Sequence, residues 1–249
     1  MASTERVEAR LFGSAAVALR CPNYYRYWDQ LERPEIDDID VVSVGRNETA
    51  LRQALLCMGY DEPWAARPFA TLYSRRLFVP HEGGYTVEMF LDPLGFHHEI
   101  RLGSRLTMDE LTLTLADLVL SKLQFADLPR KHLIDLTTLL GEHSVVAAGM
   151  TGIDRQRIST LCSNDWELWH TITLNLQCLQ EFVASDVPEG AFGRKRALQG
   201  IELLRQQLET SKKTARWYIR QIADSATRGR LPIGAPVENL VNDRWQNWR

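Results

Sequence analysis

The chain has 249 residues, of which 45% are hydrophobic and 24% are charged, so it can bury a core as one large domain or two small ones. It starts with charged and small residues instead of an apolar leader, and no later run reaches the length of a membrane span. We therefore expect a soluble, cytoplasmic protein with no membrane partner. Its four scattered cysteines predict reduced, mostly packed thiols rather than a disulfide framework.

The pattern of apolar residues changes near residue 105. Up to that point, short β-rich runs at 7–12, 39–44, 77–80 and 85–91 alternate with a helical pattern at 48–58. Beyond it, helices are expected at 113–126, 130–140, 165–183 and 194–223. These patterns predict an α/β (α+β) domain at 1–105 and an all-helical domain at 106–230. Pro232, Gly234 and Pro236 then predict a flexible tail at 231–249.

The first candidate site residues are Gly13 and Ser14, which end an apolar strand and are followed by small residues that favour a helix. Glycine lets a backbone approach closely, a serine hydroxyl can donate to a phosphate oxygen, and a helix start offers free N–H groups. The pair could therefore hold a phosphate. A strand-to-helix corner of this kind is also common as plain structure.

Two carboxylates share one face of the strand at 38–42. Strand alternation turns Asp38 and Asp40 to one side, while Ile39 and Val41 point to the other and can be buried. Like charges held so close are stabilised by a cation between them, and oxygen ligands suit Mg²⁺ or Mn²⁺. The alternative is an acidic strand end exposed to water.

A third carboxylate comes from the strand at 85–91, where Glu88, Phe90 and Asp92 alternate with Val87, Met89 and Leu91. In two-metal phosphoryl chemistry such an acid completes the ligand set and can accept the proton of an attacking hydroxyl. We choose Glu88 for this role because Asp92 precedes Pro93, where an aspartate usually forms a turn. A solvent-facing Glu88 is the alternative.

Lys122 is the cation to examine in the helical half. On a helical wheel it falls inside an apolar stripe, so its ammonium group either reaches the rim of an interface or points at an anion in a cleft. That stripe contains Leu111, Leu115, Leu118, Val119 and Ala126. Asp135 lies at the flank of the next helix, away from its apolar stripe, and is predicted to form a surface ion pair.

Three further features are interpreted as structural. His97 and His98 point to opposite faces of a strand and cannot easily share one metal ion. The basic segment at 194–230 holds ten Lys and Arg against three Asp and Glu, which could follow an RNA backbone but is better explained as a solvated helix face. The aromatic residues at 24–28 could stack on a base, although core packing explains them more simply.

The strand, Gly-Ser, helix, Asp-x-Asp and later acid over residues 7–92 resemble the nucleotidyltransferase superfamily. The chain looks closest to the abortive-infection (AbiEii-like) toxin nucleotidyltransferases, because Arg33 precedes the Asp pair and a motif with Lys122 and Asp135 follows. The resemblance implies that Lys122 contacts nucleotide phosphates and that Asp135 and Arg33 support the site. The chain differs from the family in having Glu88 where an Asp is usual and in its long segment between Ser14 and Asp38.

The resemblance implies a nucleotidyltransferase-like mixed sheet with flanking helices and a Mg²⁺-dependent transfer of NMP from an NTP to RNA, protein or a small-molecule hydroxyl. A toxin or defence role would follow. The alternative from another class is a catalytically weak nucleotide-binding or interaction module with the same fold. A metal-dependent phosphohydrolase ranks last because the sequence lacks suitably spaced histidines. The sequence leaves the acceptor, the preferred base and the oligomeric state open.

Overall fold

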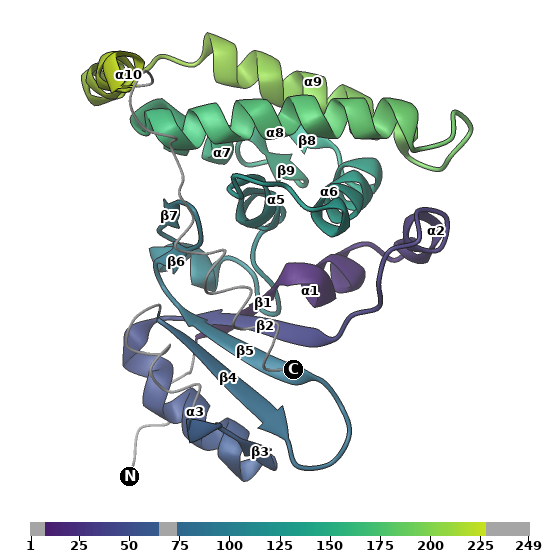
Figure 1. The fold of residues 1–249 in the computed structure, drawn as a ribbon, viewed down its shortest axis with the longest axis vertical. Coiled ribbons are helices and arrows are strands. Elements are labelled where there is room, and N and C mark those ends of the chain that lie inside the picture. The colour runs from purple at the N-terminus through teal and green to yellow at the C-terminus, as the bar shows by residue number, and fades with distance from the viewer. Residues whose placement is uncertain (1–7, 65–73, 228–249) are drawn as a thin grey trace.

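A computed structural model describes residues 8–64 and 74–227 of the chain (Figure 1). Its main element is a five-stranded mixed sheet of order β1-β2-β5-β4-β3, which confirms the predicted α/β class. The strands are β1 (Ala9–Phe12), β2 (Asp38–Ser43), β3 (Tyr60–Asp61), β4 (Arg75–Pro80) and β5 (Thr86–Leu91). Two small two-stranded sheets pair β6 (Leu94–Gly95) with β7 (Glu99–Ile100) and β8 (Val145–Val146) with β9 (Ile153–Asp154).

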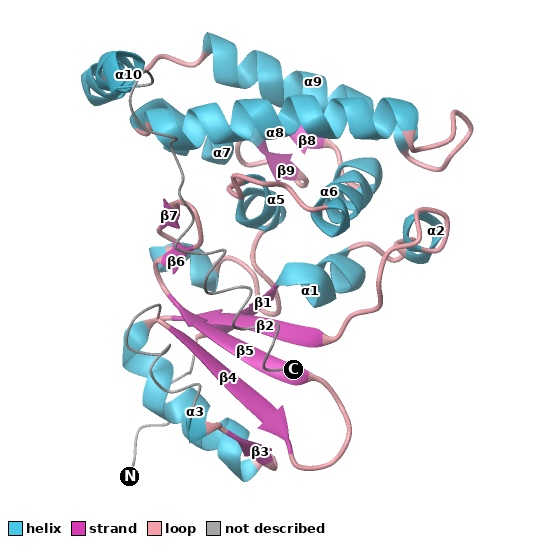
Figure 2. Ribbon diagram, in the orientation of Figure 1, coloured by secondary structure: helices cyan, strands magenta, loops and turns pink. Residues whose placement is uncertain are grey.

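Helices lie on both sides of the main sheet, as Figure 2 shows in cyan against the magenta strands. On one side is α3, whereas α1 and the long helices of the second half lie on the other. The helices in the described residues are α1 (Gly13–Arg20), α2 (Tyr25–Trp28), α3 (Glu48–Cys57), α5 (Leu115–Leu123), α6 (Arg130–Glu142), α7 (Arg155–Asn164), α8 (Trp166–Ser185), α9 (Arg194–Thr210) and α10 (Ala215–Thr227). Short 3-10 turns occur at Gly45–Asn47 and Gly103–Thr107.

The two faces of the sheet have different cores, as the predicted alternation requires. On the α3 side, Ile39 and Val41 pack with Val87, Met89 and Phe78. The opposite face carries the acids, and its Phe90 belongs to the large core shared with the helices. Strand alternation therefore separates an apolar face from a face that can hold charged groups.

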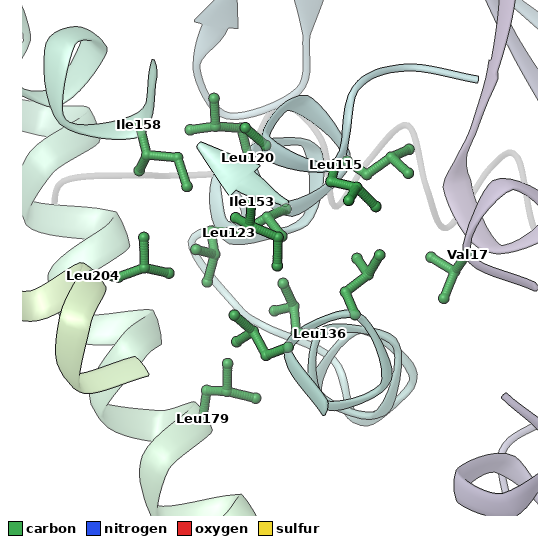
Figure 3. Packing of buried hydrophobic residues seen from close by; sticks show 14 of the residues in the cluster. Val17, Leu115, Leu120, Leu123, Leu136, Ile153, Ile158, Leu179 and Leu204 are labelled. Atoms are coloured by element: carbon green, nitrogen blue, oxygen red, sulfur yellow. The ribbon is translucent and has the colours of Figure 1, made fainter. Parts of the chain in front are cut away.

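The large core is centred on α5, whose nine residues are all buried. Leu120 and Leu123 lie among side chains from neighbouring helices, including Leu136, Leu179 and Leu204 (Figure 3). Phe12 and Val17 from β1 and α1 join the same cluster, so the helices after residue 106 pack directly on the first half of the chain. The proposed division at residue 105 stays a prediction.

Two expectations about the helices are wrong. Leu111 and Ala126 do not belong to the stripe that contains Lys122, because α5 begins at Leu115 and ends at Leu123, and both residues are exposed. The segment 194–223 is not one helix but two, α9 and α10. The chain between them is extended at Ser211, and the N–H of Thr214 donates to the carbonyl of Ser163 at 3.0 Å.

The start of α10 is held by packing as well as by that hydrogen bond. Trp217 is buried against Trp166 and Trp169, with ring centroids 4.9 Å and 5.3 Å apart.

No helix in the described part of the chain combines the length and apolar character needed to cross a membrane. The tail predicted at 231–249 lies outside the described residues.

Asp117 in α5 joins three segments. Its carboxylate is fully buried and accepts from Arg105 Nε at 2.6 Å and from Arg157 Nε at 2.9 Å. Arg105 comes from the 3-10 turn before α5, and Arg157 comes from α7. The carboxylate also accepts from the hydroxyl of Thr114, which caps α5.

We therefore expect Asp117→Ala to lower the free energy of unfolding by about 3 kcal/mol, because two arginines would lose their buried partner. Urea unfolding followed by circular dichroism measures the change. Asp127→Ala, at an exposed aspartate in the loop after α5, serves as the matched control. Equal stability of the two variants would contradict this account of Asp117.

Candidate metal centre

The acids predicted on two strands meet at the centre of the main sheet. Strands β2 and β5 are parallel, and their register places Asp40 directly opposite Glu88 and Asp38 opposite Thr86. One oxygen from each of Asp38, Asp40 and Glu88 lies within 4.8 Å of the others. The structure thus brings together the three residues predicted as metal ligands, which we call the acid triad.

The acid triad fits a divalent cation by its chemistry. All three donors are carboxylate oxygens, which Mg²⁺ and Mn²⁺ prefer, although such a donor set does not distinguish these ions from other hard cations. Burial raises the pKa of Asp40 well above its usual value, and the charges of Glu88 and Asp38 raise it further. Arg75 and Lys122 act in the opposite direction but do not outweigh these effects.

Gly13 makes the close packing of Asp40 possible. Phe12, the last residue of β1, pairs with Asp40, and Gly13 then starts α1 with a φ of +66°. A Cβ atom at this position would lie 2.8 Å from Cγ of Asp40 and closer still to Oδ2. Glycine is therefore required both for the left-handed backbone and for the space beside the carboxylate.

Asp135 forms a second charged centre, and the expectation of a surface ion pair is wrong. Its side chain has 0% exposure and accepts from Arg33 Nε and Lys122 Nζ, each at 2.7 Å. The Ser14 hydroxyl donates to the same carboxylate at 3.0 Å and accepts from Arg33. The structure therefore joins Asp135, Arg33, Lys122 and Ser14, which we call the basic cluster.

Charge balance holds Asp135 ionised. Burial alone would raise its pKa, but Lys122 and Arg33 outweigh burial and lower the pKa to about 2. The Arg33 guanidinium also lies 4.0 Å from the ring centroid of Trp28, a cation–π contact that fixes its plane. Two cations face one carboxylate, so the basic cluster carries a net positive charge beside the negative acid triad.

The structure bears out the structural interpretation of some other residues and corrects that of others. Asp92 accepts from the N–H groups of Leu102 at 2.7 Å and Gly103 at 3.1 Å, as expected of a turn residue. His97 and His98 lie in the bend between β6 and β7, so the expectation that they alternate along a strand is wrong. His98 contacts the hydroxyl of Thr171 at 2.9 Å. Among the aromatic residues at 24–28, Tyr27 and Trp28 are buried in the large core, whereas Tyr25 is exposed. Of the four cysteines, Cys21 and Cys162 are buried but Cys57 and Cys178 are exposed, so the expectation that the thiols are mostly packed is wrong.

Sequence reasoning missed Arg75, the first residue of β4. One of its Nη atoms donates to Oε2 of Glu88, and its guanidinium lies 5.0 Å from the ring centroid of Phe90. The antiparallel register of β4 with β5 sets Arg75 opposite Phe90 and Leu77 opposite Glu88. An arginine at the start of a strand is common, so only this register could have identified it.

Scans of protein-family models, curated proteins and solved structures found no match to this chain. The interpretation of the two charged centres therefore rests on their own geometry and chemistry.

We expect Gly13→Ala to weaken Mn²⁺ binding about tenfold, because the new Cβ must displace the Asp40 carboxylate from its partners. Strain at the positive φ should also lower the free energy of unfolding by about 1–3 kcal/mol. Titration calorimetry measures the first effect and urea unfolding the second. Gly45→Ala is the matched control, since a Cβ there would meet no atom within 4 Å. Unchanged Mn²⁺ affinity in Gly13→Ala would refute this role.

A second prediction follows from the raised pKa of Asp40. A carboxyl group whose folded pKa exceeds its unfolded value destabilises the fold fully at pH values above the folded pKa, and this effect is lost progressively as pH falls from the folded to the unfolded pKa. With a chelator at pH 7.5, Asp40→Asn should therefore be more stable than wild type, and the difference should shrink as pH falls. Urea unfolding across this pH range provides the measurement. Lower stability of Asp40→Asn at pH 7.5 would contradict the electrostatic account.

Proposed function

We propose that the protein is a Mg²⁺- or Mn²⁺-dependent nucleotidyltransferase that moves an NMP from an NTP to a hydroxyl or terminus of an RNA, a protein or a small molecule. The acid triad on adjacent parallel strands, with Gly13 against Asp40, is the observation that carries the proposal. In this proposal the mixed sheet is a nucleotidyltransferase-like fold, and the helices after residue 106 form its C-terminal domain. The proposal also places the protein in the cytoplasm and gives it a toxin or defence role.

The reaction forms a bond between the acceptor oxygen and the α-phosphorus of the NTP. The bond from that phosphorus to the oxygen bridging the α- and β-phosphates breaks, and pyrophosphate leaves. Asp38 and Asp40 would hold the divalent ions, and Glu88 would complete the ligand set and serve as the base that takes up the acceptor proton. When bound, these ions supply charge neutralisation at the entering and leaving oxygens.

In this proposal, the basic cluster supplies the positive charge that faces the phosphates of the NTP. Lys122 is close enough to the acid triad to affect the pKa of Asp40, while its ammonium group also contacts Asp135. Asp135 positions Lys122 and Arg33 by hydrogen bonds, and Ser14 places the start of α1 against the same group. Buried cations held in this way can face developing negative charge with little reorganisation.

One observation favours the alternative of a catalytically weak nucleotide-binding or interaction module. Ser14 and Lys122, the side chains expected to contact phosphate, both contact Asp135 in this structure. A phosphate would have to compete with that carboxylate. Calorimetry separates the two functions: NTP binding that survives both Mg²⁺ removal and Asp38→Ala plus Asp40→Ala favours the module.

The transferase is tested with purified protein, Mg²⁺, each NTP labelled at the α-phosphate, and pools of RNA or protein. We expect label on an acceptor together with released pyrophosphate. Asp38→Ala plus Asp40→Ala should slow transfer more than about a hundredfold, because metal ions contribute several kcal/mol to such transition states. Asp61→Ala is the control, an exposed acid at the far edge of the same sheet. No difference between wild type and the double variant would exclude the proposal.

A further inference from the structure

Arg75 gives the acid triad a cation of its own. Its guanidinium donates to Glu88, whose side chain is 2% exposed, while Arg75 itself is 15% exposed. Phe90, two residues along β5, lies beneath the same guanidinium. The ion pair and the cation–π contact together hold Arg75 beside the carboxylates, on the face of the sheet opposite to the α3 core.

A divalent cation at the acid triad would share Glu88 with this guanidinium. Two positive groups on one buried carboxylate repel each other, and the low local dielectric strengthens the repulsion. A polyphosphate bound to the cation brings negative charge, which offsets this repulsion and attracts the Arg75 guanidinium. The same side chain therefore opposes binding of the bare cation and favours binding of the cation with its nucleotide.

We propose that Arg75 is the built-in counter-ion of the acid triad and makes divalent cation binding depend on the nucleotide. This inference rests on the proposed function and adds a regulatory element to that site. Arg75 acts on the cation through Glu88 and on the nucleotide through its charge, and it takes no part in bond breaking. By linkage, the gain in cation affinity caused by the nucleotide equals the gain in nucleotide affinity caused by the cation.

The test compares Arg75→Gln with wild type in two calorimetric titrations. Mn²⁺ is titrated alone, and the α,β-methylene analogue of each NTP, which blocks transfer, is titrated at saturating Mn²⁺. Arg75→Gln should bind Mn²⁺ about tenfold more tightly and the preferred analogue about tenfold more weakly, a size typical of couplings between sites. Arg75→Lys, which keeps the charge, should retain the weak Mn²⁺ binding of wild type.

Arg76→Gln is the matched control. Arg76 is the next residue of β4 and pairs with Glu48 and Glu62, with Arg76 Nε 2.6 Å from Glu48 Oε1 and Nη1 2.6 Å from Glu62 Oε1. It lies opposite Met89, which belongs to the α3 side of the sheet. Its loss should alter stability but neither titration, which separates the effect of Arg75 from a general loss of ion pairs in β4.

Opposite shifts in the two affinities support the proposal, because a damaged site would lose both. A parallel fall of both affinities, or no change in either, overturns it. If wild type transfers NMP while Arg75→Gln matches wild type in both titrations, the proposed role of Arg75 is wrong, whereas the proposed transferase function is supported. If wild type binds Mn²⁺ but none of the analogues, the proposed function and the nucleotide dependence both fail.

Discussion

The parallel pairing of β2 with β5 is the constraint on which the charged part of the structure depends. It places Asp40 directly opposite Glu88, with Asp38 two residues earlier on the same face. Burial of Asp40 and the repulsion between these neighbouring carboxylates both raise the pKa of Asp40, and burial has the larger effect. Two neighbouring residues make this arrangement possible. Gly13 leaves space for the Asp40 carboxylate, and Arg75 offsets part of the negative charge by pairing with Glu88.

Strand alternation made the acid triad predictable, because side chains two residues apart share a face whatever surrounds the strand. It was enough to group Asp38 with Asp40 and Glu88 with Phe90, and the resemblance supplied the expectation that the two groups meet. The pairing of Arg75 with Glu88 could not be predicted from the sequence, because the register of β4 against β5 is set by the chain that connects them and by packing.

Helical periodicity was a weaker guide to burial. Asp135 lies off the apolar stripe of α6, which predicts exposure for a helix on a surface, but α6 packs against α1, α2, α5, α8 and α9 and is covered on several sides. Polar residues such as Thr137 and Thr138 are buried there as well. The break between α9 and α10 depends on contacts with Ser163, Trp166 and Trp169, which no local pattern reveals.

The two charged centres are joined through two consecutive residues. Gly13 contacts Asp40 of the acid triad, and Ser14 contacts Asp135 of the basic cluster, so the start of α1 separates a negative site from a positive one. A metal ion bound to a triphosphate has the complementary arrangement, with a cation beside anionic oxygens. In the proposed function the metal faces the acids and the phosphates face Lys122 and Arg33. Asp135 then has two opposing effects. It keeps both cations ordered and buried, but any phosphate must compete with its carboxylate for Lys122 and Arg33.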